Sequence, residues 1–519
     1  MRSIARGLFC VSIVAACSTK VAVYPVTPNK GTPVVKTPKQ PEPPVVTTID
    51  EIYVPHMNRL DGAQAISPDT PEKIARLLQE GYGALDTVPG QAPVARSLTG
   101  ETPPASGAHP WRMTRFVHLS DLQLADDESP ARVATLDSTG ETDGAYRAQE
   151  GYGCIMINAA VHTINRINAN DPLGFVLMGG DNADNAQANE QNWVLTLMRG
   201  GAIECDSGND DDPVPGPGND PKDPFVAEGL ELPFYWVTGN HDVLMQGNVP
   251  VLPPINQTAI GGDSPLGTRD YSLPGAPIVT GTVPADPRRH LLPRAELMAL
   301  IASDGDGHGI GPQQVASGRA FYTFDIPGSE LRFVVLDTAA ESGGDAGILH
   351  QPDVNGWIKP TLDQAQAEGK LVVLTSHHSL ATLSLDGGEL GVTQADAEKP
   401  EDYAALLAQY PNIVLSLVGH SHHHQVNELE LSPTRTIWEV MTSALADYPN
   451  QFRVVEIWDE DNGWLTIRTV CVDFDNPLDP LVAEGRSLAT ADFTSGWGLD
   501  GRRDASHTNV ILWVKKPPN

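Results

Sequence analysis

The feature that most limits the possible folds is a series of short, almost wholly apolar runs that each end in a polar corner. The series begins after Trp111 and includes RFVHLSD, GFVLMGGD, FYWVTGNHD, RFVVLDTA, KLVVLTSHH and NIVLSLVGHSH. Continuous apolar runs of this kind are typical of strands buried on both faces. Helical patterns such as GCIMINAAVHTINRINAN and PTLDQAQAEG lie between several of them. This alternation predicts an α/β sandwich.

Polar side chains collect in five of these corners, where the predicted strands end. The corners read SDLQ (120–123), GDNADN (180–185), GNHD (239–242), SHH (376–378) and GHSHHH (419–424). Because ligands in α/β sheets gather at the carboxyl ends of strands, we expect the corners to meet. Their carboxylate, amide and imidazole donors suit Zn, Mn or Fe better than a soft metal. Glycines 180, 239 and 419 let the backbone turn tightly beside these donors.

The order of the motifs, D-x-(H), GDxxDN, GNHD, (H)H and GHxH, resembles that of the calcineurin-like metallophosphoesterase superfamily. The resemblance covers roughly Thr114 to Asp473 and depends on the ordered set, since each motif alone is weak. It implies a four-layer α/β/β/α sandwich in which two mixed sheets pack face to face with helices outside. The stretches DNADNAQ and TSALADYPNQFRVVEI are similar to a bacterial exported subgroup of this superfamily.

The resemblance also implies two divalent metal ions that share Asp181 as a bridging ligand. The other implied ligands are Asp121, Gln123 and His422 for the first ion and Asn240, His377 and His420 for the second. His241 matches the histidine that faces the substrate phosphate and can protonate the leaving oxygen. Asp242 and Asp184 match carboxylates that orient ligand imidazoles.

Such a centre has a definite chemistry. Two divalent ions about 3.5–4 Å apart lower the pKa of a bridging water and hold both oxygens of an in-line displacement. A neighbouring histidine adds acid–base catalysis of roughly 10²–10⁴-fold. We therefore predict hydrolysis of a small phosphomonoester or phosphodiester by attack of the bridging hydroxide. The substrate and the choice among Mn, Fe and Zn stay open. Tyr146, Arg147 and Arg319 are further candidates for contact with phosphate.

Gln123 stands where the superfamily usually has a histidine. Its amide oxygen can bind a hard ion but is neutral and a weaker donor than imidazole. We therefore expect the first site to bind its metal more weakly or to prefer Mn or Mg. An alternative is a cell-surface binding or scaffolding lipoprotein with a structural or decayed metal site. A lactamase-type hydrolase is disfavoured because no HxHxDH string occurs.

The charge balance limits the partners. With 34 basic and 66 acidic residues, the chain has a formal net charge of −32. Such a surface repels phosphate backbones and anionic lipid, so nucleic-acid binding through a basic face is not expected. A small phosphorylated substrate is still compatible, because two dications would dominate the local field.

The first residues, MRSIARGLFCVSIVAACS, have the layout of a signal peptide. VAAC, ending at Cys17, resembles a bacterial lipobox, in which the cysteine is acylated and becomes the new N-terminus. We expect an exported protein, periplasmic or at the cell surface, held at the membrane by this lipid alone. A plain secretory signal or a short buried segment is the alternative. No other stretch approaches the roughly 20 apolar residues of a spanning helix.

Composition suggests five segments. They are a signal peptide (1–16), a Pro-rich linker (17–48), an N-terminal extension (49–110), the metallophosphoesterase domain (111–480) and a C-terminal extension (481–519). The N-terminal extension contains one predicted helix, TPEKIARLLQEGYGAL, capped by Thr70. Insertions near 201–230 and 245–318 show no clear periodicity, so we predict long loops there.

The cysteines and one acidic stretch complete the sequence evidence. Cys154, Cys205 and Cys471 remain after the N-terminal pair, and no CxxC occurs, so a thiolate zinc site is not indicated. One disulfide among the three is possible, and its pairing stays open. The stretch 205–225, CDSGNDDDPVPGPGNDPKDPF, lacks EF-hand spacing and is interpreted as a solvated acidic loop rather than a Ca²⁺ site.

Overall fold

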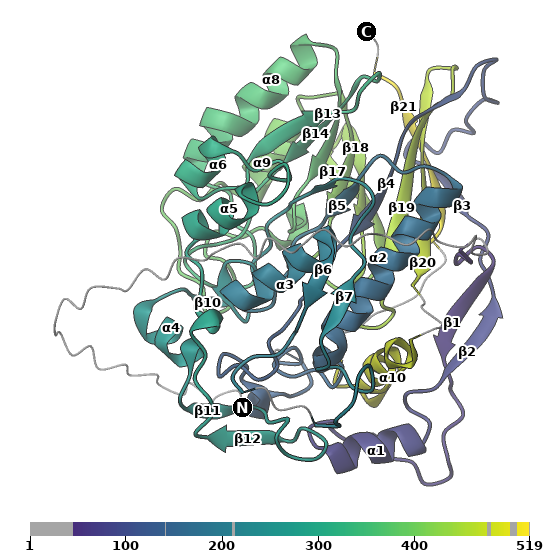
Figure 1. Cartoon of the computed structure of the whole chain (residues 1–519). Coiled ribbons are helices and arrows are strands. Elements are labelled where there is room, and N and C mark those ends of the chain that lie inside the picture. The colour runs from purple at the N-terminus through teal and green to yellow at the C-terminus, as the bar shows by residue number, and fades with distance from the viewer. Residues whose placement is uncertain (1–44, 141, 210–212, 475–478, 499–505, 518–519) are drawn as a thin grey trace, which may run out of the picture.

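The computed structural model describes residues 45–140, 142–209, 213–474, 479–498 and 506–517 (Figure 1). The predicted signal peptide, Cys17 and almost all of the predicted linker lie outside these residues. Within them, the chain forms two large mixed sheets, as the sequence predicts. No helix in these ranges combines the length and apolar character that crossing a bilayer requires.

The first large sheet has seven strands in the order β3-β21-β20-β19-β4-β5-β8. In that order they span Val94–Ser97, Val510–Lys515, Trp464–Asp473, Gln451–Asp459, Trp111–Leu119, Val176–Met178 and Phe234–Tyr235. β4, β5 and β8 run parallel, whereas β19 pairs antiparallel with both β4 and β20. The parallel part therefore brings the ends of β4, β5 and β8 to one edge.

The second large sheet has six strands in the order β13-β14-β15-β16-β18-β17. In that order they span Tyr322–Asp325, Leu331–Val335, Leu371–Thr375, Ile413–Val418, Arg435–Met441 and Gln425–Ser432. The four central strands are parallel and the two outer ones antiparallel. Every residue of β15 and β16 is buried, as expected for apolar strands that are covered on both faces.

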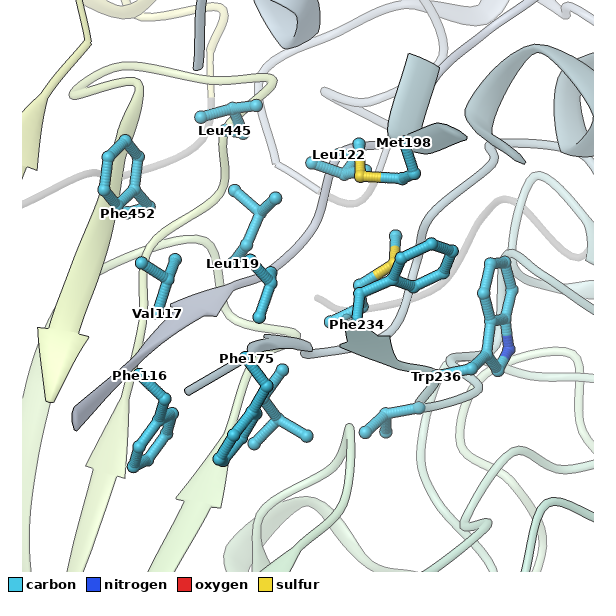
Figure 2. Close-up of a cluster of buried hydrophobic side chains, with 14 of the residues drawn as sticks. Phe116, Val117, Leu119, Leu122, Phe175, Met198, Phe234, Trp236, Leu445 and Phe452 are labelled. Atoms are coloured by element: carbon cyan, nitrogen blue, oxygen red, sulfur yellow. The ribbon is translucent and has the colours of Figure 1, made fainter. Parts of the chain in front are cut away.

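The two sheets pack directly on each other through aromatic side chains. Phe116 of β4 meets Phe333 of β14 edge to face, with ring centroids 5.3 Å apart. Phe175 stacks on Phe116 at 4.8 Å, and Figure 2 shows these two rings side by side below Val117 and Leu119. Such a dry interface between inner faces holds the strand ends of both sheets in fixed register.

Helices cover the outer faces. α2 (Gly153–Asn170) and α3 (Ala188–Arg199) share a buried cluster with the strands of the first sheet. α8 (Lys359–Ala367) and α9 (Pro400–Leu407) bury apolar side chains against the second. The α/β/β/α sandwich is thereby confirmed. The helical pattern that we located at residues 153–170 coincides with α2.

Both predicted extensions contribute to this framework. α1 (Pro71–Gln79) begins after Thr70, whose hydroxyl accepts a hydrogen bond from the backbone N–H of Lys73, as predicted. It contacts α10 (Pro480–Ser495) of the C-terminal extension. β3 pairs in parallel with β21, so strands from the two extensions complete the first sheet together. A hairpin-like pair, β1 (Glu51–Pro55) and β2 (Leu85–Pro89), lies beside them.

The expectation of a long loop over residues 245–318 is wrong. This insertion carries β9 (Leu244–Met245) with β10 (Val249–Pro250), β11 (Ser264–Arg269) with β12 (Ile278–Gly281), α4 (Pro253–Ile260), α5 (Arg294–Ala302) and α6 (Pro312–Ser317). These elements are short, and α5 buries Leu297, Met298, Leu300 and Ile301 on one face while apolar Ala295 and Ala299 stand on its exposed face, so apolar and polar residues do not alternate clearly along it. A periodicity argument therefore misses it.

The insertion near 201–230 is closed at its base by β6 (Gly201–Ile203), which pairs with β7 (Phe225–Ala227). Cys154 of α2 and Cys205 form a disulfide, and Cys471 lies buried in β20. The remaining short elements are α7 (Gln351–Asp353), a π-helical turn (Val354–Ile358) and 3₁₀ turns at Ala134–Leu136, Glu150–Tyr152, Pro287–Arg289 and Leu380–Thr382.

Candidate metal centre

The polar corners of both sheets meet at one place, as the sequence predicts. Donor atoms of Asp121, Asp181 and His377 all lie within 4.8 Å of one another. His377 Nε2 is 2.9 Å from Asp181 Oδ2 and 3.9 Å from Asp121 Oδ1. Asp121 follows β4, Asp181 follows β5 and His377 follows β15, so the cluster joins the two sheets.

The backbone is strained at these corners. Positive φ angles occur at Asp121 (51°), Gln123 (36°), Asp181 (51°), His420 (77°) and His422 (57°). Residues with a Cβ rarely adopt this left-handed region, at a cost of about 1–3 kcal/mol each when the conformation is sparsely populated. Five of the seven predicted ligands have this left-handed backbone conformation, and such strained residues cluster at active sites and ligand-binding sites.

Glycine is required beside the donors. A Cβ on Gly239 would lie 2.1 Å from Asp181 Oδ1. A Cβ on Gly419 would lie 2.0 Å from Ser120 Oγ and 2.7 Å from an oxygen of Asp121. Both distances are impossible contacts, so a side chain at either position would push the carboxylates out of place.

Hydrogen bonds aim the histidine rings. His377 Nδ1 donates to the carbonyl of Gly179 at 2.9 Å, and His422 Nδ1 donates to Asp447 Oδ2 at 2.6 Å. Each bond fixes the ring so that Nε2 faces Asp121 or Asp181, and His422 Nε2 lies 3.5 Å from Asp121 Oδ1. Holding one ring nitrogen so that the other can bind a metal is the usual arrangement for ligand histidines.

The strongest test of fit comes from atoms that lack a partner. Within the described residues, Gln123 Oε1 and Asn240 Oδ1 are buried without a hydrogen-bond partner, and Asp181 Oδ2 and His377 Nε2 have no partner other than each other, 2.9 Å apart. The Asn240 amide donates to the carbonyl of Gly247 at 3.1 Å, which leaves its oxygen as the donor atom. An unsatisfied buried polar atom costs about 1–3 kcal/mol. Divalent cations would satisfy these oxygen and nitrogen donors, so the residues fit the implied metals.

His420 and His378 differ in availability. The backbone N–H of His420 donates to both oxygens of Asp121 at 3.1 Å. Burial, together with the imidazoles of His378 and His377, lowers the pKa of His420 and keeps its ring in the neutral, metal-binding form. His378 instead has both nitrogens engaged, Nδ1 with the Thr338 hydroxyl and Nε2 with the carbonyl of Asp345, each at 2.9 Å.

His241 lies next to the cluster and has a carboxylate behind it. Its backbone N–H donates to Asp181 Oδ1 at 2.8 Å. Its Nδ1 donates to the carbonyl of Asp184 at 2.8 Å and is 3.3 Å from Asp184 Oδ1. Burial alone would lower the pKa of His241, but Asp181 and Asp184 outweigh it and raise that pKa to about 9. The ring can therefore carry a proton at neutral pH.

Asp242, which the resemblance matches to a carboxylate that orients ligand imidazoles, binds the backbone instead. Its carboxylate accepts hydrogen bonds from the N–H groups of Asn182 (3.0 Å), Ala183 (3.1 Å) and Gly239 (2.9 Å). These bonds join the corner that carries Asp181 to the corner that carries Asn240. Asp242 is therefore a support for the ligands.

Three important residues of the site could not be recognised in the sequence. Asp447 holds His422, and Arg132 and Arg147 both pair with Asp184. Asp447 lies in the stretch TSALADYPNQFRVVEI quoted above for its similarity, but neither it nor Arg132 stands in a motif that assigns it a role. Arg147 was predicted as a possible phosphate contact, together with Tyr146, but these side chains are only 4% and 2% exposed.

A second acidic group is neutralised within the protein. Asp126, Asp127 and Glu128 lie close together, but Lys222 Nζ is 2.6 Å from Asp127 and 3.2 Å from Glu128. Arg289 pairs with Asp126 at 3.1 Å. Lys222 belongs to the stretch 205–225, which was interpreted as a solvated acidic loop. That interpretation is wrong for Lys222 itself, because its cationic side chain is buried among these carboxylates.

Of two cavities in the described part of the chain, one adjoins the centre. One of about 320 Å³ lies on the first sheet, lined by residues such as Val45, Arg115 and Val510, and contains none of the predicted ligands. Another of about 20 Å³ is lined by Gln123, Arg147 and other residues, and lies directly beside the centre.

Comparison with known proteins gives structural similarity only, since no protein-family model and no curated protein matches the chain. A dimetal phosphatase from Danio rerio is 11% identical over 70% of this chain and 100% of that one, with a TM-score of 0.39. The purple acid phosphatase of yellow lupin seeds is 11% identical over 74% of this chain and 54% of its own (TM-score 0.28). The NAD nucleotidase of Haemophilus influenzae is 10% identical over 69% and 49% (TM-score 0.26).

Proposed function

We propose that this chain is a calcineurin-like metallophosphoesterase that hydrolyses a small phosphomonoester or phosphodiester. The observation that carries the proposal is a set of buried donor atoms on Gln123, Asp181, Asn240 and His377 that have no partner outside the set, gathered where the strand ends of the two sheets meet. Hard oxygen donors combined with imidazole nitrogens are the ligand set of divalent ions such as Mn, Fe and Zn.

The proposed ligands divide into two groups around Asp181. Asp121, Gln123 and His422 would hold one ion, and Asn240, His377 and His420 the other. Asp181 is the ligand proposed for both ions. Its Oδ1 accepts a hydrogen bond from the backbone N–H of His241, which fixes the carboxylate, and its Oδ2 lies 2.9 Å from His377 Nε2, at the middle of the ligand set. When bound, the two ions supply an activated water and neutralise the charge of the phosphate.

His241 is the proposed proton donor. Its Nδ1 is held by Asp184, so Nε2 is the atom that can give a proton to the leaving oxygen. The side chain is 15% exposed, whereas Asp184 behind it is fully buried. Proton transfer by a positioned histidine contributes roughly 10²–10⁴-fold to the rate.

The proposal extends to location. We propose export and a lipid anchor at Cys17, because of the N-terminal sequence pattern. The Cys154–Cys205 disulfide supports this, since disulfides persist mainly in oxidising compartments. Labelling with a radioactive fatty acid should depend on Cys17, and a Cys17→Ser chain that still incorporates it would contradict the anchor.

The decisive experiment combines metal analysis with a substrate panel. Purified protein should contain divalent metal and hydrolyse p-nitrophenyl phosphate or bis(p-nitrophenyl) phosphate. Asn240→Ala and Asp181→Asn should abolish turnover while the circular dichroism spectrum is unchanged. Asn58→Ala, at an exposed asparagine, is the matched control. Normal turnover in Asn240→Ala would refute the assignment, and full metal occupancy without hydrolysis of any ester would favour a binding protein.

A further inference from the structure

Two histidines of the centre are each held by a buried carboxylate. Asp184 lies behind His241, the proposed proton donor, at 3.3 Å from Nδ1. Asp447 lies behind His422, a ligand of the first proposed ion, at 2.6 Å from Nδ1. The two carboxylates come from distant parts of the chain, one after β5 and one after β18. Their relative position therefore depends on what lies between them.

Arg147 lies between them. Its Nη1 is 3.3 Å from Asp184 Oδ1, and its Nε is 3.1 Å from Asp447 Oδ1. The guanidinium is 4% exposed, and the side chains of Asp184 and Asp447 are 0% and 6% exposed. A planar guanidinium presents donors in a fixed fork, so it can hold two carboxylates at a set separation.

The two carboxylates differ in their other partners. Asp184 also pairs with Arg132, which in turn contacts Glu150. Asp447 receives only a neutral hydrogen bond besides Arg147 and His422, from the Gln149 amide at 3.1 Å. Arg147 is therefore the sole permanent positive charge that the structure places against Asp447, within the described residues. A buried carboxylate without its cation is costly, so Asp447 depends on Arg147 for its place.

Arg147 also lines the same small cavity as Gln123, another ligand proposed for the first ion. The cavity of about 20 Å³ is lined by Gln123, Arg147 and Gln149 among others. The same short segment, Arg147–Gln149, thus adjoins Gln123 and anchors the carboxylate behind His422. Of the three ligands proposed for the first ion alone, His422 is thus linked to this segment through Asp447, and Gln123 lines the same cavity.

We infer that Arg147 is a positioning residue that sets both sides of the centre at once, the His241 side through Asp184 and the first metal site through Asp447. The inference rests on the proposed function for the role of His241, but its effect on metal binding can be measured without turnover. A lysine cannot replace it, because a single ammonium lacks the fork that spans both carboxylates.

The test compares four variants of the full chain. Arg147→Lys and Arg147→Met remove the shared link, Asp447→Asn alters the His422 side without a direct contact to Asp184, and Arg132→Lys alters the Asp184 side without a direct contact to Asp447. Arg486→Lys is the matched control, since this buried arginine pairs with Asp473 and contacts none of the proposed ligands. Mn²⁺ binding to chelator-treated protein is measured by calorimetry, and kcat and KM are measured with p-nitrophenyl phosphate.

Both Arg147 variants should weaken one Mn²⁺ site by about 10–100-fold, the usual effect of losing a support behind a ligand. They should also lower kcat with little change in KM. Asp447→Asn should reproduce the Mn²⁺ effect, and Arg132→Lys only the kcat effect. If Arg147→Met does not fold, Arg147→Lys and Asp447→Asn still decide the matter.

Wild-type Mn²⁺ affinity in Arg147→Lys would overturn the inference. So would a loss no larger than that of Arg486→Lys, which would indicate a purely structural role. The two proposals fail in different ways. A protein that hydrolyses no ester but loses Mn²⁺ affinity on Arg147 substitution would refute the enzyme while supporting Arg147 as the support of the metal site.

Discussion

Metal binding to the chelator-treated protein should become tighter as pH rises, because a proton occupies one of the ligand nitrogens. His377 is fully buried, which alone would lower its pKa, but Asp181 at 2.9 Å from Nε2 outweighs burial and raises that pKa to about 9. A metal ion binds only the deprotonated imidazole, so ion and proton compete for the same nitrogen.

The size of the effect follows from this pKa. At pH 7, about two units below the pKa of His377, about 1% of the imidazole is free to bind. The apparent affinity should then be about a hundredfold below its limit at high pH, or roughly 3 kcal/mol. Between pH 6 and pH 8 it should rise about tenfold per unit, with about one proton released per ion bound at this site.

Calorimetric titration of Mn²⁺ at pH 6, 7 and 8, in buffers with different ionisation enthalpies, measures both quantities. His377→Gln is the control, since an amide oxygen can approach the ion but has no proton to lose, and its affinity should depend less on pH. If the Mn²⁺ affinity of the second proposed site stays constant from pH 6 to 8 in the unmodified protein, ion and proton do not compete for His377 and the prediction is wrong. An equal slope in His377→Gln would assign the proton to another group.

Three further changes test separate parts of the structure. Gln123→His should tighten Mn²⁺ or Zn²⁺ at the first site without abolishing turnover, because imidazole is the stronger donor; an unchanged affinity would exclude Gln123 as a ligand. Gly239→Ala should lower kcat by about 10²-fold, because the new Cβ would lie 2.1 Å from Asp181 Oδ1 and would force this carboxylate to move. Steady-state kinetics together with metal analysis would detect the change. Reduction of Cys154–Cys205, which closes a segment of 51 residues, should lower the free energy of unfolding by about 2–5 kcal/mol in urea denaturation.

The corners of the candidate metal centre were predictable because their signals are local. Each corner directly follows an apolar run that forms a strand, so the parallel strands β4 and β5 bring Asp121 and Asp181 together, and the packing of the two sheets adds His377 after β15. The glycine at 239 belongs to the same motif as Asn240. In these corners, residues that are close in the sequence are also close in space, so the motifs were enough to predict which side chains lie together.

The supports behind the ligands follow no such rule. Asp447 and Arg147 are 300 residues apart in the sequence, and no motif indicates that they form an ion pair. Charged residues are usually solvated, so a buried ion pair between two loops has no signature in a single sequence. Arg147 was therefore interpreted as a contact for phosphate. α5 was missed for a different reason, since apolar Ala295 and Ala299 on its exposed face obscure the apolar period that identifies a helix.

The pairing of β3 with β21 has a consequence for how the molecule is made. β3 lies early in the chain, and its partner appears only after the intervening residues 98–509 have been synthesised, on the order of a minute at roughly 5–20 residues per second. Until β21 appears, β3 lacks the strand with which it pairs, and its unpaired backbone is an open template for pairing with other chains. This interval exposes the nascent protein to aggregation, so we expect chaperone supply during synthesis to influence its yield.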